Sequence, residues 1–327
     1  MKSNRILSTL CCSCLFLLPC LVSAEGLLTP GIPVELNGTQ GKFDFVKIDP
    51  ANHRFLACHT GNGTLDVIDV ATSKMIKSIP TGAAQGVALD PAGGRYFLSV
   101  SKPPKLVIID ANKLEITGEV SLSDPADLVA YHVGTDRVYV CNDEKPELWI
   151  IDPTAKKIIS TITFPGAGME DLCFDDHGAF LFQCLKDSSE LIKVDVKDGK
   201  IVAHWPTAPA DKPHGMEPIR GTDTAVIVGG TGKLVLIDLS TGKILASTDI
   251  ALKVDEIAYD SVAHRVYCAS GSGTISVVAV EANSLQTLKS LTSAPGAHSV
   301  AVDSKTHTAW IAFAKDGKSY IQSFTEK

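Results

Sequence analysis

The feature that most constrains this chain is an internal repeat of about 42 residues. An apolar stretch ending in Ile-Asp or Val-Asp recurs along the sequence, and its closing aspartates are spaced by 41 to 43 residues: Asp69, Asp110, Asp152, Asp195 and Asp238. A second polar column closes an earlier stretch of most units: Asp49, Asp90, His132, Asp175, Asp260 and Asp303. A fixed period of this length predicts neighbouring copies of one small structural unit.

Each unit contains four short apolar strands separated by turn residues. Gly, Pro, Asp and Asn break the chain around runs such as 54–58, 95–99 and 137–141, and no helical period interrupts them. Four strands per repeat at this period are typical of a propeller blade. The sequence therefore predicts an all-β, seven-bladed β-propeller with four-stranded blades. Its units begin near residues 43, 85, 127, 170, 214, 255 and 298.

The last unit is one strand short. It has apolar strands near 298–303, 308–314 and 319–324, and then the sequence stops. Residues 31–38 precede the first unit and resemble the fourth strand of the other units. We expect this N-terminal strand to complete the C-terminal blade and close the ring, because closure removes the sheet edges that a linear array would expose.

Several units also resemble a known repeat family. Residues 139–142, Tyr-Val-Cys-Asn, are similar to the signature of the YVTN-repeat propellers, and residues 267–270 are a looser copy. Residues 213–215 and 237–243 match other parts of that repeat. The resemblance extends over 31–327 and is to exported bacterial YncE-like proteins. It implies the propeller fold and diverse binding roles, since this fold also serves lactonases and dehydrogenase subunits.

Residues 1–24 have the pattern of a secretory signal peptide. Lys2 and Arg5 form a basic start, residues 6–18 form a short apolar segment, and residues 22–24 offer small side chains for cleavage after Ala24. A lipoprotein signal is the alternative, but a proline precedes Cys20 where a small residue is needed.

The mature chain, residues 25–327, is therefore expected to be one propeller domain, periplasmic or secreted, and monomeric. No later apolar run approaches the about 20 residues of a membrane-spanning helix. The formal net charge of the whole chain is −7, which argues against a broad basic surface for nucleic acid.

Five cysteines remain after the signal peptide, an odd number for an exported protein. Three of them occupy equivalent small-residue positions on different blades, where packed sheets lie about 10 Å apart. A disulfide needs Cα atoms within about 7 Å. We therefore expect all five to be buried free thiols: Cys58, Cys141, Cys173, Cys184 and Cys268.

The candidate site is a ring of polar residues at the starts of the innermost strands. Each unit contributes one residue: Asp44, Gln85, Asp127, Glu170, His214, Asp255 and His298. Innermost propeller strands line the central channel, so closure is expected to bring these residues to one mouth. His59 and Asn142 end second strands on the same face and are expected to support the ring.

Crowded carboxylates repel one another, so this ring is expected to recruit a cation, to raise carboxylate pKa values or to protonate its histidines. Histidine with carboxylates suits a divalent transition metal, and carboxylates alone suit Ca²⁺. The metal would lie among residues of five consecutive blades: Glu170, His214, Asp255, His298 and Asp44. A wet channel mouth that binds nothing is the alternative.

Two functions are consistent with these residues. The favoured one is an exported, non-catalytic binding or scaffold propeller that presents its mouth to a small molecule, peptide or protein. The other is a lactonase-like hydrolase, in which a metal polarises the carbonyl and His214 or His298 acts as base. Binding is favoured because the sequence has no Gly-x-Ser-x-Gly elbow and no complete metal-ligand motif.

Overall fold

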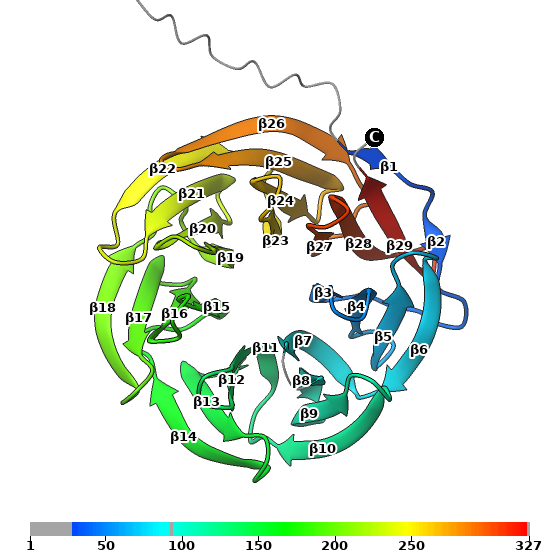
Figure 1. Cartoon of the computed structure of the whole chain (residues 1–327), viewed down its shortest axis with the longest axis horizontal. Helices are drawn as coiled ribbons and strands as arrows, with labels where there is room; N and C mark the ends of the chain where they lie inside the picture. The colour runs from blue at the N-terminus through cyan, green and yellow to red at the C-terminus, as the bar shows by residue number, and fades with distance from the viewer. Residues whose placement is uncertain (1–27, 92–93, 326–327) are drawn as a thin grey trace, which may run out of the picture.

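The structure, a computed structural model, describes residues 28–91 and 94–325, and these residues form seven antiparallel sheets arranged in a ring (Figure 1). The expected signal peptide, residues 1–24, lies outside the described residues. Within the described ranges no helix has the length and hydropathy needed to span a membrane. The predicted all-β, seven-bladed propeller is confirmed.

Six blades are built from consecutive strands that run from the channel outward. The first blade comprises β3 (Val46–Asp49), β4 (Arg54–His59), β5 (Thr64–Asp69) and β6 (Lys74–Pro80). The second comprises β7 (Ala83–Asp90), β8 (Arg95–Lys102), β9 (Pro104–Asp110) and β10 (Glu115–Ser121). The third comprises β11 (Ala126–His132), β12 (Arg137–Asn142), β13 (Glu147–Asp152) and β14 (Lys157–Thr163). The fourth blade comprises β15 (Met169–Phe174), β16 (Phe180–Leu185), β17 (Glu190–Asp195) and β18 (Lys200–Pro206). The fifth comprises β19 (Pro213–Ile219), β20 (Thr224–Gly229), β21 (Lys233–Asp238) and β22 (Ile244–Asp249). The sixth comprises β23 (Val254–Asp260), β24 (Arg265–Ser270), β25 (Thr274–Glu281) and β26 (Ser284–Thr292).

The seventh blade joins the two ends of the described chain. It contains β27 (Val300–Asp303), β28 (Thr308–Lys315) and β29 (Lys318–Thr325), and its outer strand is made by β1 (Thr29–Pro30) and β2 (Val34–Glu35). Both short strands pair antiparallel with β29. The expected closure is therefore present, but its outer strand begins before residue 31 and is interrupted between β1 and β2.

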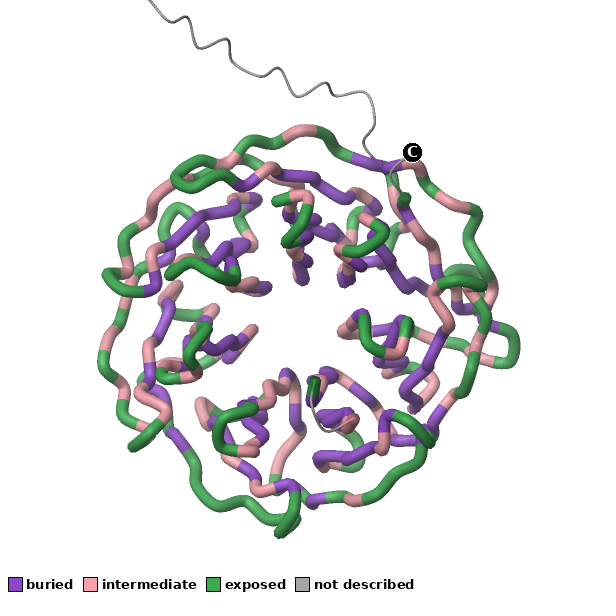
Figure 2. Tube along the Cα trace, viewed as in Figure 1, coloured by how far each residue is buried: buried purple, intermediate pink, exposed green. Residues whose placement is uncertain are grey.

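The hydrophobic core lies between the blades. Seven buried clusters are found among the described residues, and each joins side chains of two neighbouring blades. The second and third strands are mostly buried, whereas most residues of the outermost strands are exposed or half-buried (Figure 2). The five expected cysteines are all buried and free, as predicted. Small side chains on the second strands therefore let the sheets pack face to face.

The repeated aspartates act as turn caps. Asp110 Oδ1 accepts hydrogen bonds from the backbone N–H groups of Asn112 and Lys113, both at 2.9 Å. Asp238 Oδ1 does the same for Ser240 and Thr241 at 2.8 and 2.9 Å. These side chains satisfy turn N–H groups at the strand ends, so the most regular column of the sequence serves the fold.

Candidate binding site at the channel mouth

The residues of the polar ring occupy one irregular position in the inner strands. In five blades the register with the second strand shifts over two residues, and the first of the two is the ring residue: Gln85, Asp127, Glu170, His214 and Asp255. Asp44 and His298 lie at the matching positions, two residues before β3 and β27. Such an irregularity changes the direction of a side chain relative to a regular strand.

Most of the ring faces one cavity of about 360 Å³ at this end of the channel. The cavity is lined by six of the seven ring residues: Asp44, Gln85, Asp127, Glu170, His214 and Asp255. His298 is not in the lining but contacts Asp255. The role of these residues as a ligand site stays a prediction.

The two expected supporting residues do not line the cavity. His59 is buried, and its Nδ1 lies 2.7 Å from Asp66 Oδ2 within its own blade. Asn142 Oδ1 accepts hydrogen bonds from the backbone N–H groups of Glu144 and Lys145 at 2.9 and 3.1 Å. The Asn142 side chain is used by the turn of its own blade, whereas His59 Nε2 also lies 3.0 Å from Ser319 Oγ of the seventh blade.

Three charged residues that the sequence reasoning missed also line the cavity: Asp143, Lys186 and Glu256. Asp143 and Lys186 directly follow the second strands β12 and β16, so a column placed one residue after each second strand would have found them. Glu256 is the second residue of its irregularity. A regular two-residue alternation would place it on the other face from Asp255, which is why it was overlooked.

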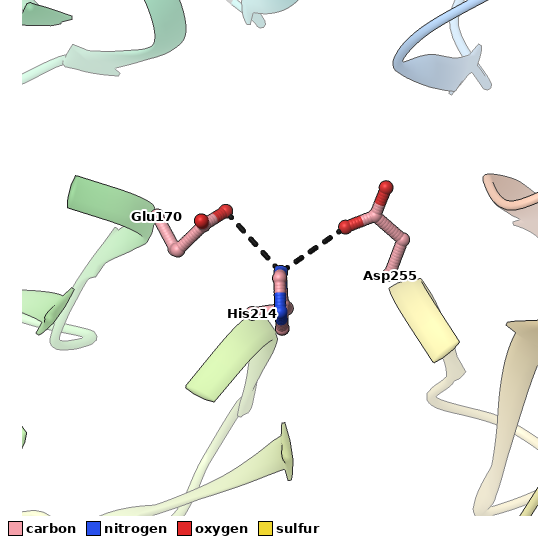
Figure 3. Close-up of side chains that lie close together, drawn as sticks. All are labelled: Glu170, His214 and Asp255. Carbon is pink, nitrogen blue, oxygen red and sulfur yellow. Dashed lines mark ion pairs between the residues drawn. The ribbon is translucent and has the colours of Figure 1, made fainter. Parts of the chain in front are cut away.

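His214 lies between two carboxylates of neighbouring blades (Figure 3). Its Nδ1 is 3.2 Å from Asp255 Oδ1 and 3.5 Å from Glu170 Oε2. Neither contact has hydrogen-bond geometry, so Nδ1 has charge partners but no aligned hydrogen bond. β15, β19 and β23 therefore bring three titratable side chains to one wall of the mouth.

Each carboxylate of this wall has a second cationic partner on its other oxygen. Lys186 Nζ contacts Glu170 Oε1. His298 Nδ1 lies 3.0 Å from Asp255 Oδ2. One oxygen of each carboxylate is therefore paired with Lys186 or His298, while the other oxygen, Oε2 of Glu170 and Oδ1 of Asp255, faces His214.

The pKa values of the mouth follow from burial and crowding. Burial raises the pKa of Asp44 to about 6, and it raises the pKa of Asp127 well above the ordinary value. Burial also disfavours the charged form of Asp255, but His214 and His298 overcome it and hold the pKa of Asp255 below its usual range. Asp255 and Glu170 in turn raise the pKa of His214 to about 9.

The opposite wall is acidic and only partly compensated, because His298 and Lys42 oppose but do not overcome the burial that raises the pKa of Asp44. Asp44 and Asp127 lie there with Gln85. In the amide orientation that satisfies the hydrogen bonds of Gln85, its side-chain nitrogen donates to Asp44 Oδ2 at 3.3 Å. In total the lining contains six carboxylates and two side chains that carry positive charge, Lys186 and His214. No hydroxyl or thiol side chain of the described residues lines this cavity. A lining with this excess of carboxylates is chemically suited to a cation.

Comparisons with known proteins agree with this fold. The profile of a family described as outer membrane protein assembly factor BamB matches residues 87–321. No curated protein matches the chain. The finer resemblance to YVTN-repeat and YncE-like proteins stays a prediction.

Solved propellers are similar in structure at low identity. The structure of U3-55K and the crystal structure of RRP9 WD40 repeats each have a TM-score of 0.77 and 11% identity, over 91% of this chain and 100% of theirs. Hydrazine synthase of Kuenenia stuttgartiensis has a TM-score of 0.73 and 12% identity, over 88% of this chain and 98% of that chain. At these identities the likeness shows the fold alone.

Proposed function

Because the chain belongs to the propeller family described as outer membrane protein assembly factor BamB, we propose that it is a non-catalytic binding propeller of the bacterial periplasm. Its channel mouth receives a cationic group of a partner, such as a lysine or arginine side chain. The observation that carries this proposal is the excess of carboxylates around one cavity of about 360 Å³.

The size and polarity of the cavity support a small charged guest. Its volume is at the lower end of the range for ligand pockets, about 300 to 1,000 Å³, so one side chain or one small molecule suits it. Asp44 and Asp127 are half-buried acids whose pKa values are raised. A guest cation would favour their ionised forms and be bound by charge-assisted hydrogen bonds.

The periplasmic location is supported by the predicted signal peptide and by the family description. A monomer with one mouth would bind one partner segment at a time. Fractionation of the source bacterium, together with the mass of the purified protein in solution, tests both statements. Recovery in the cytoplasm with residues 1–24 retained would contradict the proposed location.

The hydrolase alternative is less well supported by the charges of the mouth. A general base must be unprotonated, and the neighbouring carboxylates raise the pKa of His214 to about 9. The pKa of His298 is raised as well, by Asp255. The His214 ring is therefore favoured in the imidazolium form at neutral pH, which suits pairing with the neighbouring carboxylates more than proton abstraction.

Calorimetric titration with three blocked peptides tests the cation preference. The peptides are acetyl-Gly-Arg-Gly-amide, acetyl-Gly-Lys-Gly-amide and acetyl-Gly-Glu-Gly-amide. The two cationic peptides are expected to bind at a ratio of one, and binding is expected to weaken as salt is added. Equal or absent binding of all three peptides at low salt would overturn the proposal.

Neutralising the acidic wall locates the binding. Asp127→Asn is expected to weaken the arginine peptide about tenfold, since a hydrogen bond to a charged group is lost. Glu115→Gln removes the same charge from an exposed position on β10 and is the matched control. If both variants weaken binding equally, only long-range charge matters and the mouth is not the site.

A further inference from the structure

The wall made by Glu170, His214 and Asp255 has the spacing of a metal centre (Figure 3). Two ligand atoms that are each about 2.1 Å from one ion lie about 3.4 Å apart at a tetrahedral angle and about 3.0 Å apart at a right angle. His214 Nδ1 is 3.2 and 3.5 Å from its two carboxylate oxygens. One ion among the three atoms would therefore reach all of them with small side-chain movements.

We propose that this wall binds one divalent transition metal ion, with Glu170 Oε2, His214 Nδ1 and Asp255 Oδ1 as its protein ligands. The three ligand atoms lie within 4.8 Å of one another. Glu170 must rotate slightly toward Asp255, which its flexible side chain permits. One imidazole nitrogen with two carboxylate oxygens suits Zn²⁺, Mn²⁺ or Co²⁺ rather than Ca²⁺, which is bound by oxygen alone.

The remaining oxygens of the two carboxylates support this ligand set. Lys186 contacts Glu170 Oε1 and His298 contacts Asp255 Oδ2, so neither partner competes for the oxygen that faces His214. Metal-binding carboxylates are commonly held in place by such outer contacts. Lys186 and His298 are therefore positioning residues, because they fix the ligands without touching the ion.

An independent observation in the same cavity favours a cation there. Glu256 is 8% exposed and lines the mouth, and its Oε2 has no hydrogen-bond partner. Asp255 and Glu170 are among the negative groups that surround it. An unpartnered buried carboxylate is costly, and a divalent ion at the neighbouring wall would supply positive charge to it.

The metal proposal goes beyond the proposed function and does not depend on it. The ion uses the wall from β15, β19 and β23, whereas the peptide experiment probes Asp127 on the inner strand β11. Peptide binding measured in the presence of a chelator tests the proposed function without any metal at the wall. The two proposals can therefore fail separately.

Metal analysis and calorimetry of the mature chain test the site. After exposure to Zn²⁺, Mn²⁺ or Co²⁺ and extensive dialysis, the parent is expected to retain about one equivalent of at least one of these ions. His214→Ala is expected to weaken that ion about 100-fold or more, and Glu170→Gln to weaken it similarly. His298→Ala is expected to weaken it about tenfold, as the loss of an outer contact does.

The control is a histidine on an outer strand. His204 on β18 lies 3.9 Å from Glu190 and 45% of its side chain is exposed, so His204→Ala removes a histidine–carboxylate contact elsewhere. Its metal affinity is expected to equal that of the parent, and the Co²⁺ absorption spectrum of the parent should disappear only in the mouth variants. Failure of all three ions to bind the parent, or unchanged affinity of His214→Ala and Glu170→Gln, would overturn the proposal.

Discussion

At the scale of the residue, His214 links the mouth to pH. Its pKa is raised to about 9, against 6.5 for the free side chain, so the folded protein holds this proton more tightly than the unfolded chain does. The resulting stabilisation is complete below about pH 6.5 and is lost as the pH rises through about 9. We expect the urea midpoint of the metal-free parent to fall over this window.

His214→Gln is the variant that isolates this contribution. It removes the titrating group, so its urea midpoint should fall less than that of the parent between pH 6.5 and 9.5. His204→Gln, on the outer strand β18, should follow the parent across the whole series. Parallel pH profiles for the parent and His214→Gln would refute the link.

The ring residues were predictable one by one because each occupies the same place in its repeat. The repeat period, together with the Pro-His-Gly motif at 213–215, aligned Asp127 with His214, although their chemistry differs. Glu256 was not predictable, because the irregular register of β23 breaks the alternation from which its direction would be read. Nor does the sequence show that Lys186 contacts Glu170, since a side-chain contact between the residue after β16 and β15 depends on the completed blade.

At the scale of the element, the N-terminal segment joins three blades. Leu28 packs into the cluster between the sixth and seventh blades, and Leu36 packs into the cluster between the seventh and first. Between them, Gly31 N–H donates to Ser323 O at 2.7 Å. The segment therefore fills two interblade cores as well as completing one sheet.

Shortening Leu36 tests this role of the segment. Leu36 is 3% exposed, so Leu36→Ala should lower the free energy of unfolding by about 2–4 kcal/mol, as buried Leu→Ala changes do. Ile32 lies in the same segment but is 89% exposed, and Ile32→Ala should leave stability almost unchanged. The two chemical denaturation curves are compared directly, and equal midpoints would show that the segment adds little to the core.

The bounds of this outer strand were the part of the fold that the sequence predicted least well. The motif at 31–38 indicated the strand, but its pairing partner β29 lies at the other end of the chain. Pro33 has no N–H to donate, and the pairing is interrupted there before it resumes at β2. Local pattern identifies a strand, whereas long-range pairing decides where it begins and stops.

At the scale of the whole molecule, the seventh blade makes the ends of the described chain neighbours. Thr29 is paired with Thr325, so a short linker can join the ends and new ends can be opened elsewhere. Opening the turn between β21 and β22 leaves one blade shared by both new ends. Opening the loop between β22 and β23 leaves every blade continuous.

These two circular permutants contain the same residues and differ only in where the ring is cut. We expect the permutant cut between β22 and β23 to be less stable by about 2 kcal/mol, because no sheet ties its ends together. The measurement is the urea midpoint of each, with ring formation checked by circular dichroism. If the permutant with continuous blades is equally stable, sharing a blade is unnecessary for closure.

The shared blade also sets an order of events during synthesis. A ribosome makes β1 and β2 before the other strands, yet their partner β29 lies at the other end of the described chain. The hydrogen bond from Gln322 to the carbonyl of Gly31, between β1 and β2, spans 291 residues. The earliest strands must therefore wait until almost the whole chain has emerged, and contacts this distant in sequence form slowly. Closure of the ring is therefore expected to be a late step, and until it occurs the seventh blade lacks its outer strand and leaves the edge of β29 unpaired.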